Sequence, residues 1–149
     1  GGGRLQVPRV APRAPVSRYL TESFTEEELA CRHCGRFQFH FGFLEALQLL
    51  RRDLAKPMTI RSGCRCAEYN ASPAVGGHPK SLHVLDREQH PGMRGTLAVD
   101  VEAVDGTYRG DLFATAWALD WSVGWNAKKG FLHLDRRVAI GLPKTTFDY

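Results

Sequence analysis

The stretch Leu97-Ala98-Val99-Asp100-Val101-Glu102-Ala103-Val104 decides the fold, because its side chains change character from one residue to the next. Apolar side chains stand at every second position, which is the two-residue period of a strand that is buried on one face. Ala98, Asp100 and Glu102 fall on the opposite face. The pattern therefore predicts a strand that packs one face on the core and directs the Asp100 carboxylate into a cleft on the other side.

Two further segments carry side chains of the kind that bind metal ions. The segment Phe131-Leu132-His133-Leu134-Asp135 reads as a strand with His133 and Asp135 on one face, and Ser81-Leu82-His83 ends a loop. An imidazole or carboxylate in mid-strand on the polar face needs a specific partner. Two imidazoles plus the carboxylate of Asp100 are a common ligand set for catalytic zinc, because three protein ligands leave the fourth tetrahedral position open for water.

The choice of the first histidine is not fixed by spacing. His78 and His90 both lie near His83 in the sequence, and either could take its place in such a site. A single histidine in a loop is more often solvated or hydrogen-bonded than bound to a metal ion. The residues alone therefore leave the third ligand open.

The patterns around these segments predict a single α+β domain. Helices are expected at 25–31, 42–55, 67–71 and 108–119, and further strands at 58–61, 122–125 and 131–137. The charged, turn-rich segment 85–95 is expected to be an exposed loop. Strands and helices that mix without regular βαβ alternation favour a mainly antiparallel sheet flanked by helices.

Length and composition exclude several classes of protein. A chain of 149 residues with 43% hydrophobic and 24% charged residues suits one globular domain. Its apolar runs are far shorter than the roughly 18 residues that span a bilayer. The net charge of +4 is a mild bias, and basic residues do not interleave with aromatic ones, so we expect no nucleic-acid partner.

The N-terminal part of the chain differs in composition from the rest. Residues 1–17 contain three prolines and three arginines without an apolar period, which predicts a flexible arm that precedes a domain at 18–149. Such an arm is a candidate for docking to partners, virion proteins among them.

Four cysteines form two close pairs, Cys31 with Cys34 and Cys64 with Cys66. This spacing fits a structural zinc site, one or two disulfides, or four reduced thiols. A metal ion or a disulfide between the pairs would tie the first predicted helix to the segment around Arg65.

Several motifs, taken in chain order, resemble those of the D-alanyl-D-alanine carboxypeptidase-like zinc peptidases. They are Ser62-Gly63-Cys64-Arg65-Cys66-Ala67-Glu68-Tyr69-Asn70, Val75-Gly76-Gly77 and Ser81-Leu82-His83 before the first ligand, Ala98-Val99-Asp100 at the second, and Phe131-Leu132-His133-Leu134-Asp135 at the third. This group includes bacterial and phage peptidoglycan peptidases and shares a fold with the Hedgehog signalling domain. The resemblance runs from about Phe24 to Arg137, which is most of the chain.

The resemblance implies a role for each matching residue. His83, Asp100 and His133 would hold Zn²⁺, and Arg65 would stabilise the oxyanion of the tetrahedral intermediate. A guanidinium aimed at developing charge in a dry site is worth ~10²-fold or more in rate. Ser81 would support the site from nearby.

The chain departs from the family pattern at two places. His83 and Asp100 are 17 residues apart, whereas the family usually spaces them by about seven, so residues 85–94 are read as an insertion beside the cleft. Many relatives also carry an acid three residues before the last histidine, and here that position is Gly130. Asp135 is then the nearest carboxylate, either as the general base or as a partner that orients His133.

These observations predict a zinc peptidase that hydrolyses peptidoglycan stem peptides, as a D,D-carboxypeptidase or as an endopeptidase of the endolysin type. The mild positive charge favours a phage-encoded lysin or a virion-associated protein that acts on the bacterial cell wall. The rival hypothesis is a non-catalytic structural protein, such as a phage tail component, that keeps the metal site. The missing acid at Gly130 supports this rival.

Overall fold

The structure, a computed structural model, describes residues 18–126 and 128–148. Its elements in chain order are α1 (Glu26–Leu29), α2 (Phe43–Leu54), β1 (Ile60–Ser62), α3 (Ala67–Ala71), β2 (Glu88–His90), β3 (Met93–Arg94), β4 (Ala98–Glu102), α4 (Gly106–Ala118), β5 (Ser122–Asn126), β6 (Phe131–Asp135), the 3₁₀ helix η1 (Arg137–Ile140) and β7 (Thr146–Asp148). The arm predicted at 1–17 lies outside the described residues. Among the helices that the structure describes, none is long and apolar enough to cross a membrane.

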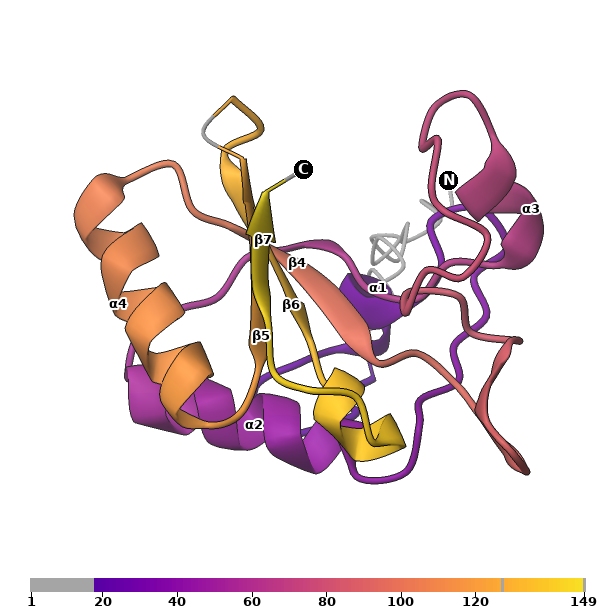
Figure 1. The fold of residues 1–149 in the computed structure, drawn as a ribbon, viewed down its shortest axis with the longest axis horizontal. Coiled ribbons are helices and arrows are strands. Elements are labelled where there is room, and N and C mark those ends of the chain that lie inside the picture. Colours follow the sequence, from indigo (N-terminus) through magenta and orange to yellow (C-terminus); the bar gives the residue numbers. More distant parts are fainter. Residues whose placement is uncertain (1–17, 127, 149) are drawn as a thin grey trace, which may run out of the picture.

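A five-stranded sheet in the order β1-β4-β6-β5-β7 forms the centre of the α+β domain (Figure 1). β4 pairs antiparallel with β1 and β6, and β5 pairs antiparallel with β6, but β7 runs parallel to β5. The sheet is therefore mixed: the pairings of β1, β4, β6 and β5 are antiparallel, and the sequence did not predict the parallel pairing of β7. The parallel pairing follows from the path of the chain. β6 ends beside the first residue of β5, and the connection through η1 is short. β7 therefore begins near the start of β5 and runs in the same direction as β5.

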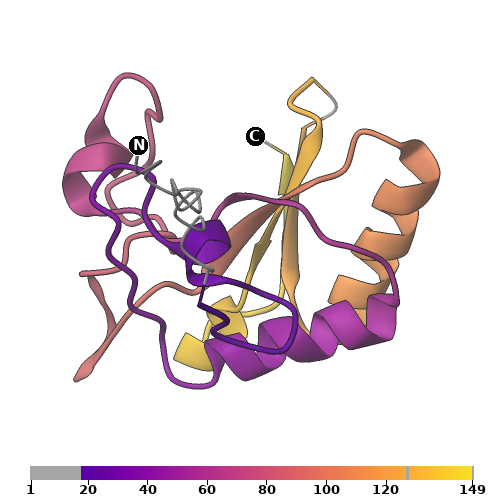
Figure 2. The same ribbon diagram turned by 180° about the vertical axis from the view of Figure 1, so that it is seen from behind.

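Helices and loops cover opposite faces of this sheet. Figures 1 and 2 show α2 and α4 on one side, and the segment that contains α3 on the other. The core lies under α2 and α4, where the sheet contributes Leu97, Val99, Val101, Leu132 and Leu134, all almost completely buried. Because side chains alternate along a strand, the neighbours of these residues point to the α3 side, and Asp100 and His133 are among them.

The first two helices follow from local sequence. Thr25 and Glu28 form the predicted capping box of α1, in which each side chain contacts the backbone amide of the other residue. The apolar stripe of α2 is buried through Phe43, Leu47, Leu50 and Leu54, and the helix ends at Ala55, two residues before Pro57. Both helices thus contribute buried side chains to the core of the domain.

The segment 85–95 is not the exposed loop that its composition predicts. Strands β2 and β3 pair antiparallel as a separate two-stranded sheet, and Leu85 and Gln89 are buried. The Gln89 amide donates a hydrogen bond to the Val84 carbonyl at 3.1 Å. The hairpin is therefore anchored to the turn that carries His83, through a contact that the composition of the segment does not reveal.

Candidate metal centre

The register of β4 and β6 places Asp100 directly opposite His133. His83 reaches the same point from the turn between α3 and β2, and it is 2% exposed. The Oδ1 atom of Asp100 lies 3.1 Å from Nε2 of His83 and 3.1 Å from Nδ1 of His133. One donor atom from each of the three residues lies within 4.8 Å of the others, a spacing at which all three can bind one metal ion. The structure thus brings together the three predicted ligands.

The His83 ring is held in one orientation by its surroundings. Its Nδ1 atom donates to the carbonyl oxygen of Gly63 at 2.8 Å, and its backbone N–H donates to Oγ of Ser81 at 3.2 Å. The backbone carbonyl of His83 accepts from the Arg65 N–H and from the Thr96 hydroxyl, each at 2.9 Å. Ser81 therefore lies where the sequence predicted a supporting residue.

The contact between His83 and Asp100 indicates a cation site. Because the Gly63 carbonyl can only accept, the proton of a neutral His83 ring sits on Nδ1, and Nε2 turns its lone pair toward the Asp100 carboxylate. Burial lowers the pKa of His83, which favours this neutral ring. Two acceptors that face each other need a cation between them, and two nitrogens with one carboxylate oxygen are a donor set that zinc takes.

His133 lies between two carboxylates. Its Nδ1 faces Asp100, and its Nε2 lies 2.8 Å from Oδ2 of Asp135. Burial lowers the pKa of His133, but the hydrogen bonds to both carboxylates outweigh this effect and raise the pKa to about 9. The metal-free site therefore holds a proton on His133 at neutral pH, in the position where a metal cation would otherwise balance the charge of Asp100.

Asp135 is completely buried and has all of its acceptor positions in use. Arg137 binds it through Nε to Oδ1 at 2.9 Å and through the terminal nitrogen to Oδ2 at 2.8 Å, and the Arg137 backbone N–H adds a third contact at 3.1 Å. Burial raises the pKa of Asp135, but the bonds from Arg137 and His133 lower it to about 2. A carboxylate in this state orients the imidazole and does not collect a proton from the cavity.

Arg65 contacts the outer oxygen of Asp100. A terminal nitrogen of its guanidinium lies 3.0 Å from Oδ2 of Asp100, and Nε donates to Oγ of Ser62 at 3.0 Å. The side chain is 14% exposed. Although burial raises the pKa of Asp100, the hydrogen bond with the charged His133 ring holds it well below its usual range. The guanidinium is therefore positioned beside an ionised carboxylate.

An open cavity of about 470 Å³ lies over this cluster. Its lining includes all three predicted ligands together with Arg65 and Lys80. This volume is within the range of small-molecule and peptide sites, roughly 300–1,000 Å³. The candidate metal centre is consequently accessible from solvent on one side and enclosed by the sheet on the other.

The other predicted histidines are not part of the cluster. His78 lines the cavity, but its ring is exposed and its Nδ1 accepts from the Lys80 backbone N–H at 3.0 Å. His90 is exposed on β2. The described residues that line the cavity include none from 85–94, so the predicted insertion braces the His83 turn from behind and does not shape the cavity wall.

The four cysteines are not joined by disulfides in the structure, which leaves the other two states that the spacing allows, a metal site and reduced thiols. Cys31, Cys34 and Cys66 lie close enough to share one metal ion, whereas Cys64 does not join them. The side chain of Cys64 is buried and donates to the Gln38 carbonyl at 3.7 Å.

Three residues near the site escaped prediction from the sequence. Asn70 is buried, and its amide group donates to the His78 carbonyl and accepts a long contact, 3.4 Å, from Arg65. Arg137 holds Asp135, and the Phe147 ring of β7 lies 5.6 Å from the His133 ring. Asn70 lies within a quoted motif, but its contacts depend on the folded loop, and β7 gave no strand signal.

Comparison with known proteins agrees with this arrangement. The sequence profile of a family described as Peptidase M15 matches residues 22–135, which span the described metal cluster and more than half of the chain. No curated protein and no solved structure matches the chain.

Proposed function

Because the chain belongs to the M15 family of peptidases, we propose that it is a zinc-dependent enzyme that hydrolyses amide bonds of peptidoglycan stem peptides or cross-links. The observation that carries this proposal is the buried His83, Asp100 and His133 cluster at the floor of an open cavity. A D,D-carboxypeptidase and an endopeptidase of the endolysin type are both forms of this activity.

The residues present fit the metal ion that the family uses. Nε2 of His83, the carboxylate of Asp100 and Nδ1 of His133 would hold Zn²⁺, and each has a second partner that fixes its orientation: Gly63, Arg65 and Asp135, respectively. When bound at such a site, Zn²⁺ polarises a carbonyl group and lowers the pKa of water to about 7.

Arg65 is the residue proposed to stabilise negative charge during hydrolysis. Its guanidinium lines the cavity and is held by Ser62, so it can donate to an oxygen that gains charge without first reorganising. Because Arg65 also contacts Asp100, its guanidinium is held on the side of the cavity where the metal ion would bind. Ser81 would support the site indirectly, because its hydroxyl oxygen accepts a hydrogen bond from the backbone N–H of His83.

The charge of the cavity supports a substrate that carries carboxylates. Lys80 and Lys129 line it, together with Arg65 and Arg137, whereas Asp100 and Asp135 are the only carboxylates among the described lining residues. Stem peptides of peptidoglycan carry free carboxylates, which such a surface attracts. The excess of basic over acidic side chains in the cavity lining therefore supports peptidoglycan stem peptides as the substrate class.

A specific observation also favours a second candidate, a non-catalytic protein, for example one associated with a phage tail, that keeps the metal site. Gly130 stands where many relatives carry the acid, and the described cavity lining offers no carboxylate besides Asp100 and the saturated Asp135. A turnover step would then need a proton acceptor from the substrate or from solvent.

Digestion of purified peptidoglycan, analysed by mass spectrometry, separates the two candidates. We expect zinc-loaded wild type to release D-alanine or cross-link fragments, and the identity of the product assigns the bond that is cut. His83→Gln should release neither, because it removes one ligand. His90→Gln is the matched control, since His90 is exposed and outside the cavity lining.

Failure to release any fragment from several wall types, by a protein that nevertheless binds zinc through the cluster, would refute the catalytic proposal and leave the structural one. Equal activity of wild type and His83→Gln would refute the ligand assignment.

A further inference from the structure

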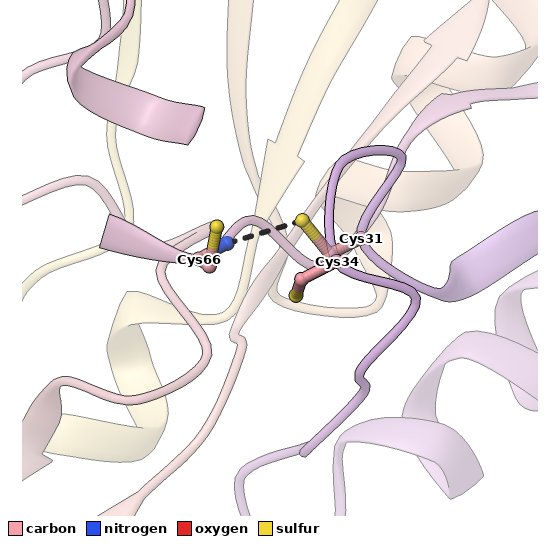
Figure 3. A group of neighbouring side chains, drawn as sticks. All are labelled: Cys31, Cys34 and Cys66. Carbon is pink, nitrogen blue, oxygen red and sulfur yellow. Dashed lines mark hydrogen bonds between the residues drawn. The ribbon is translucent and has the colours of Figure 1, made fainter. Parts of the chain in front are cut away.

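Three cysteines form a second cluster, separate from the His83 site. The Sγ atoms of Cys31, Cys34 and Cys66 lie within 4.8 Å of one another. Figure 3 shows Cys31 and Cys34 on one turn of the chain and Cys66 on a neighbouring segment, with the sulfur of Cys31 directed at the backbone nitrogen of Cys66. Cys31 directly follows the end of α1, and Cys66 caps α3. The cluster therefore joins two segments that are far apart in the sequence.

The turn from Cys31 to Gly35 is built to bring two sulfurs together. The Gly35 N–H donates to the Cys31 carbonyl, and the Cys31 N–H donates to the Arg36 carbonyl, both at 2.9 Å. Gly35 has a φ of +72°, a left-handed conformation that glycine adopts without strain. Two cysteines separated by two residues on such a tight turn have the spacing typical of one half of a structural zinc site.

Backbone amides point at the sulfurs, as they do around thiolate ligands. The Cys66 N–H donates to Sγ of Cys31 at 3.3 Å, and the Tyr69 N–H donates to Sγ of Cys66 at 3.4 Å. These donors stabilise the thiolate form, which is the form that binds metal.

His33 offers a fourth donor beside one of the three sulfurs, that of Cys66. Its Nδ1 lies 3.6 Å from Sγ of Cys66, and its ring stacks on Tyr69 at 5.9 Å with an interplanar angle of 3°. Zinc–sulfur bonds of about 2.3 Å and zinc–nitrogen bonds of about 2.0 Å at a tetrahedral angle separate sulfur from nitrogen by about 3.5 Å. The observed separation of Cys66 and His33 is close to one edge of that tetrahedron. His33 lies outside the group of donors that are all within 4.8 Å of one another, so its ring would have to turn toward the ion to reach the other two sulfurs.

The remaining cysteine has a different environment. Sγ of Cys64 is buried and donates to the Gln38 carbonyl. Cys64 therefore belongs to the core and not to the cluster, although the sequence pairs it with Cys66.

We propose that Cys31, Cys34 and Cys66 bind a structural Zn²⁺ ion, with His33 as the fourth ligand. Three thiolates and one imidazole make a closed tetrahedral site that leaves no position for water or substrate. The negative charge of this ligand set has a neighbour of opposite sign in Arg36, whose guanidinium interacts with Cys34.

The position of this site gives it a role in holding the loop that carries Arg65. Arg65 lies between Cys64 and Cys66, and its backbone bridges to Val84 beside His83. The same loop is pressed against the end of α1, since a Cβ on Gly63 would lie 2.6 Å from the Leu29 carbonyl oxygen. A metal ion bound by Cys31 and Cys66 would fix this close approach, so its loss should loosen Arg65.

Metal analysis of the full chain tests the proposal independently of activity. Protein purified under reducing conditions and dialysed without chelator should carry about two zinc equivalents. Cys66→Ser and His83→Gln should each carry about one, and the double variant none. Cys64→Ser is the matched control and should carry the same zinc as wild type.

Cobalt substitution identifies the site that is lost. The sulfur-to-cobalt charge-transfer absorption should persist in His83→Gln and disappear in Cys66→Ser. His33→Ala should weaken zinc binding at the cysteine site at least 10-fold.

Wild-type zinc content in Cys66→Ser, or a disulfide between Cys31 and Cys66 detected by mass in the purified protein, would overturn the proposal. Unchanged affinity in His33→Ala would overturn the assignment of the fourth ligand. Zinc that is lost in Cys66→Ser but unaffected by His83→Gln would support the cysteine site while contradicting the proposed catalytic one.

Discussion

Nε2 of His133 lies 2.8 Å from Oδ2 of Asp135, on the side of the ring opposite Asp100. Asp135 is fully buried and is also held by the guanidinium of Arg137. The carboxylate therefore fixes the direction in which Nδ1 of His133 points, which is the direction of the metal centre. Of the two roles that the sequence left open for Asp135, this geometry supports the positioning role.

Asp135→Asn should weaken zinc binding by ~10- to 100-fold, because an amide orients and polarises the imidazole less well than a carboxylate. Saturating zinc should restore most of the turnover. Titration of chelator-treated protein with zinc, followed by activity at each zinc concentration, measures both effects. Asp148→Asn, an exposed carboxylate on β7, is the control and should behave as wild type. A loss of turnover at saturating zinc would instead identify Asp135 as the base.

The sequence predicted the parts of this site that depend on strand periodicity. Alternation in 97–104 placed Asp100 on the face away from the core, and the same argument paired His133 with Asp135. The facing of these side chains follows from a period of two, which is local information. The selection of His83 over His78 and His90 came from the family resemblance, because a turn has no period that fixes where its side chain points.

The contacts that the sequence did not predict depend on the folded path of loops and turns, although the residues that they join lie close together in the sequence. Asn70 supports the His78 carbonyl, Arg137 neutralises Asp135, and Gln89 anchors its hairpin to Val84. Strand β7 has little apolar character, and it pairs with β5 only because η1 returns the chain to that edge. These features depend on tertiary geometry, which local propensity does not encode.

Arg65→Lys should lower kcat by ~10²-fold with little change in zinc affinity, because the lysine keeps the charge but loses the bonds to Ser62 and Asn70 that aim it. Steady-state kinetics together with zinc titration separate the two quantities. Arg94→Lys, on the β2–β3 hairpin, provides the matched control. Full turnover in Arg65→Lys would mean that the directed guanidinium is not needed.

Gly77→Ala should destabilise the protein by ~1–3 kcal/mol, because the added Cβ would lie 2.1 Å from Oδ1 of Asn70. Asn70 is buried and bonded to the His78 carbonyl, so it cannot move aside easily. Gly110→Ala is the opposite case: a Cβ there meets no atom within 4 Å, and alanine favours the interior of α4 by ~0.5–1 kcal/mol. Urea unfolding of both variants should give changes of opposite sign.

The metal-free protein should lose stability at alkaline pH through His133. The pKa of His133 in the folded state is about 9, above its ordinary value of 6.5. Its contribution to stability is therefore complete below pH 6.5 and disappears as the pH rises through 9. Chelator-treated wild type should lose up to about 3 kcal/mol relative to His133→Gln over this range. A constant difference between the two proteins would contradict the charged His133.

The most direct test of the central claim is the rate of peptide-bond hydrolysis in peptidoglycan when zinc is added back to chelator-treated protein. We expect wild-type activity to disappear with the metal and to return as zinc refills the His83, Asp100 and His133 site, while His83→Gln stays inactive at every comparable zinc concentration. Hydrolysis that persists without zinc, or that zinc restores equally in His83→Gln, would contradict the claim that this cluster holds the catalytic metal.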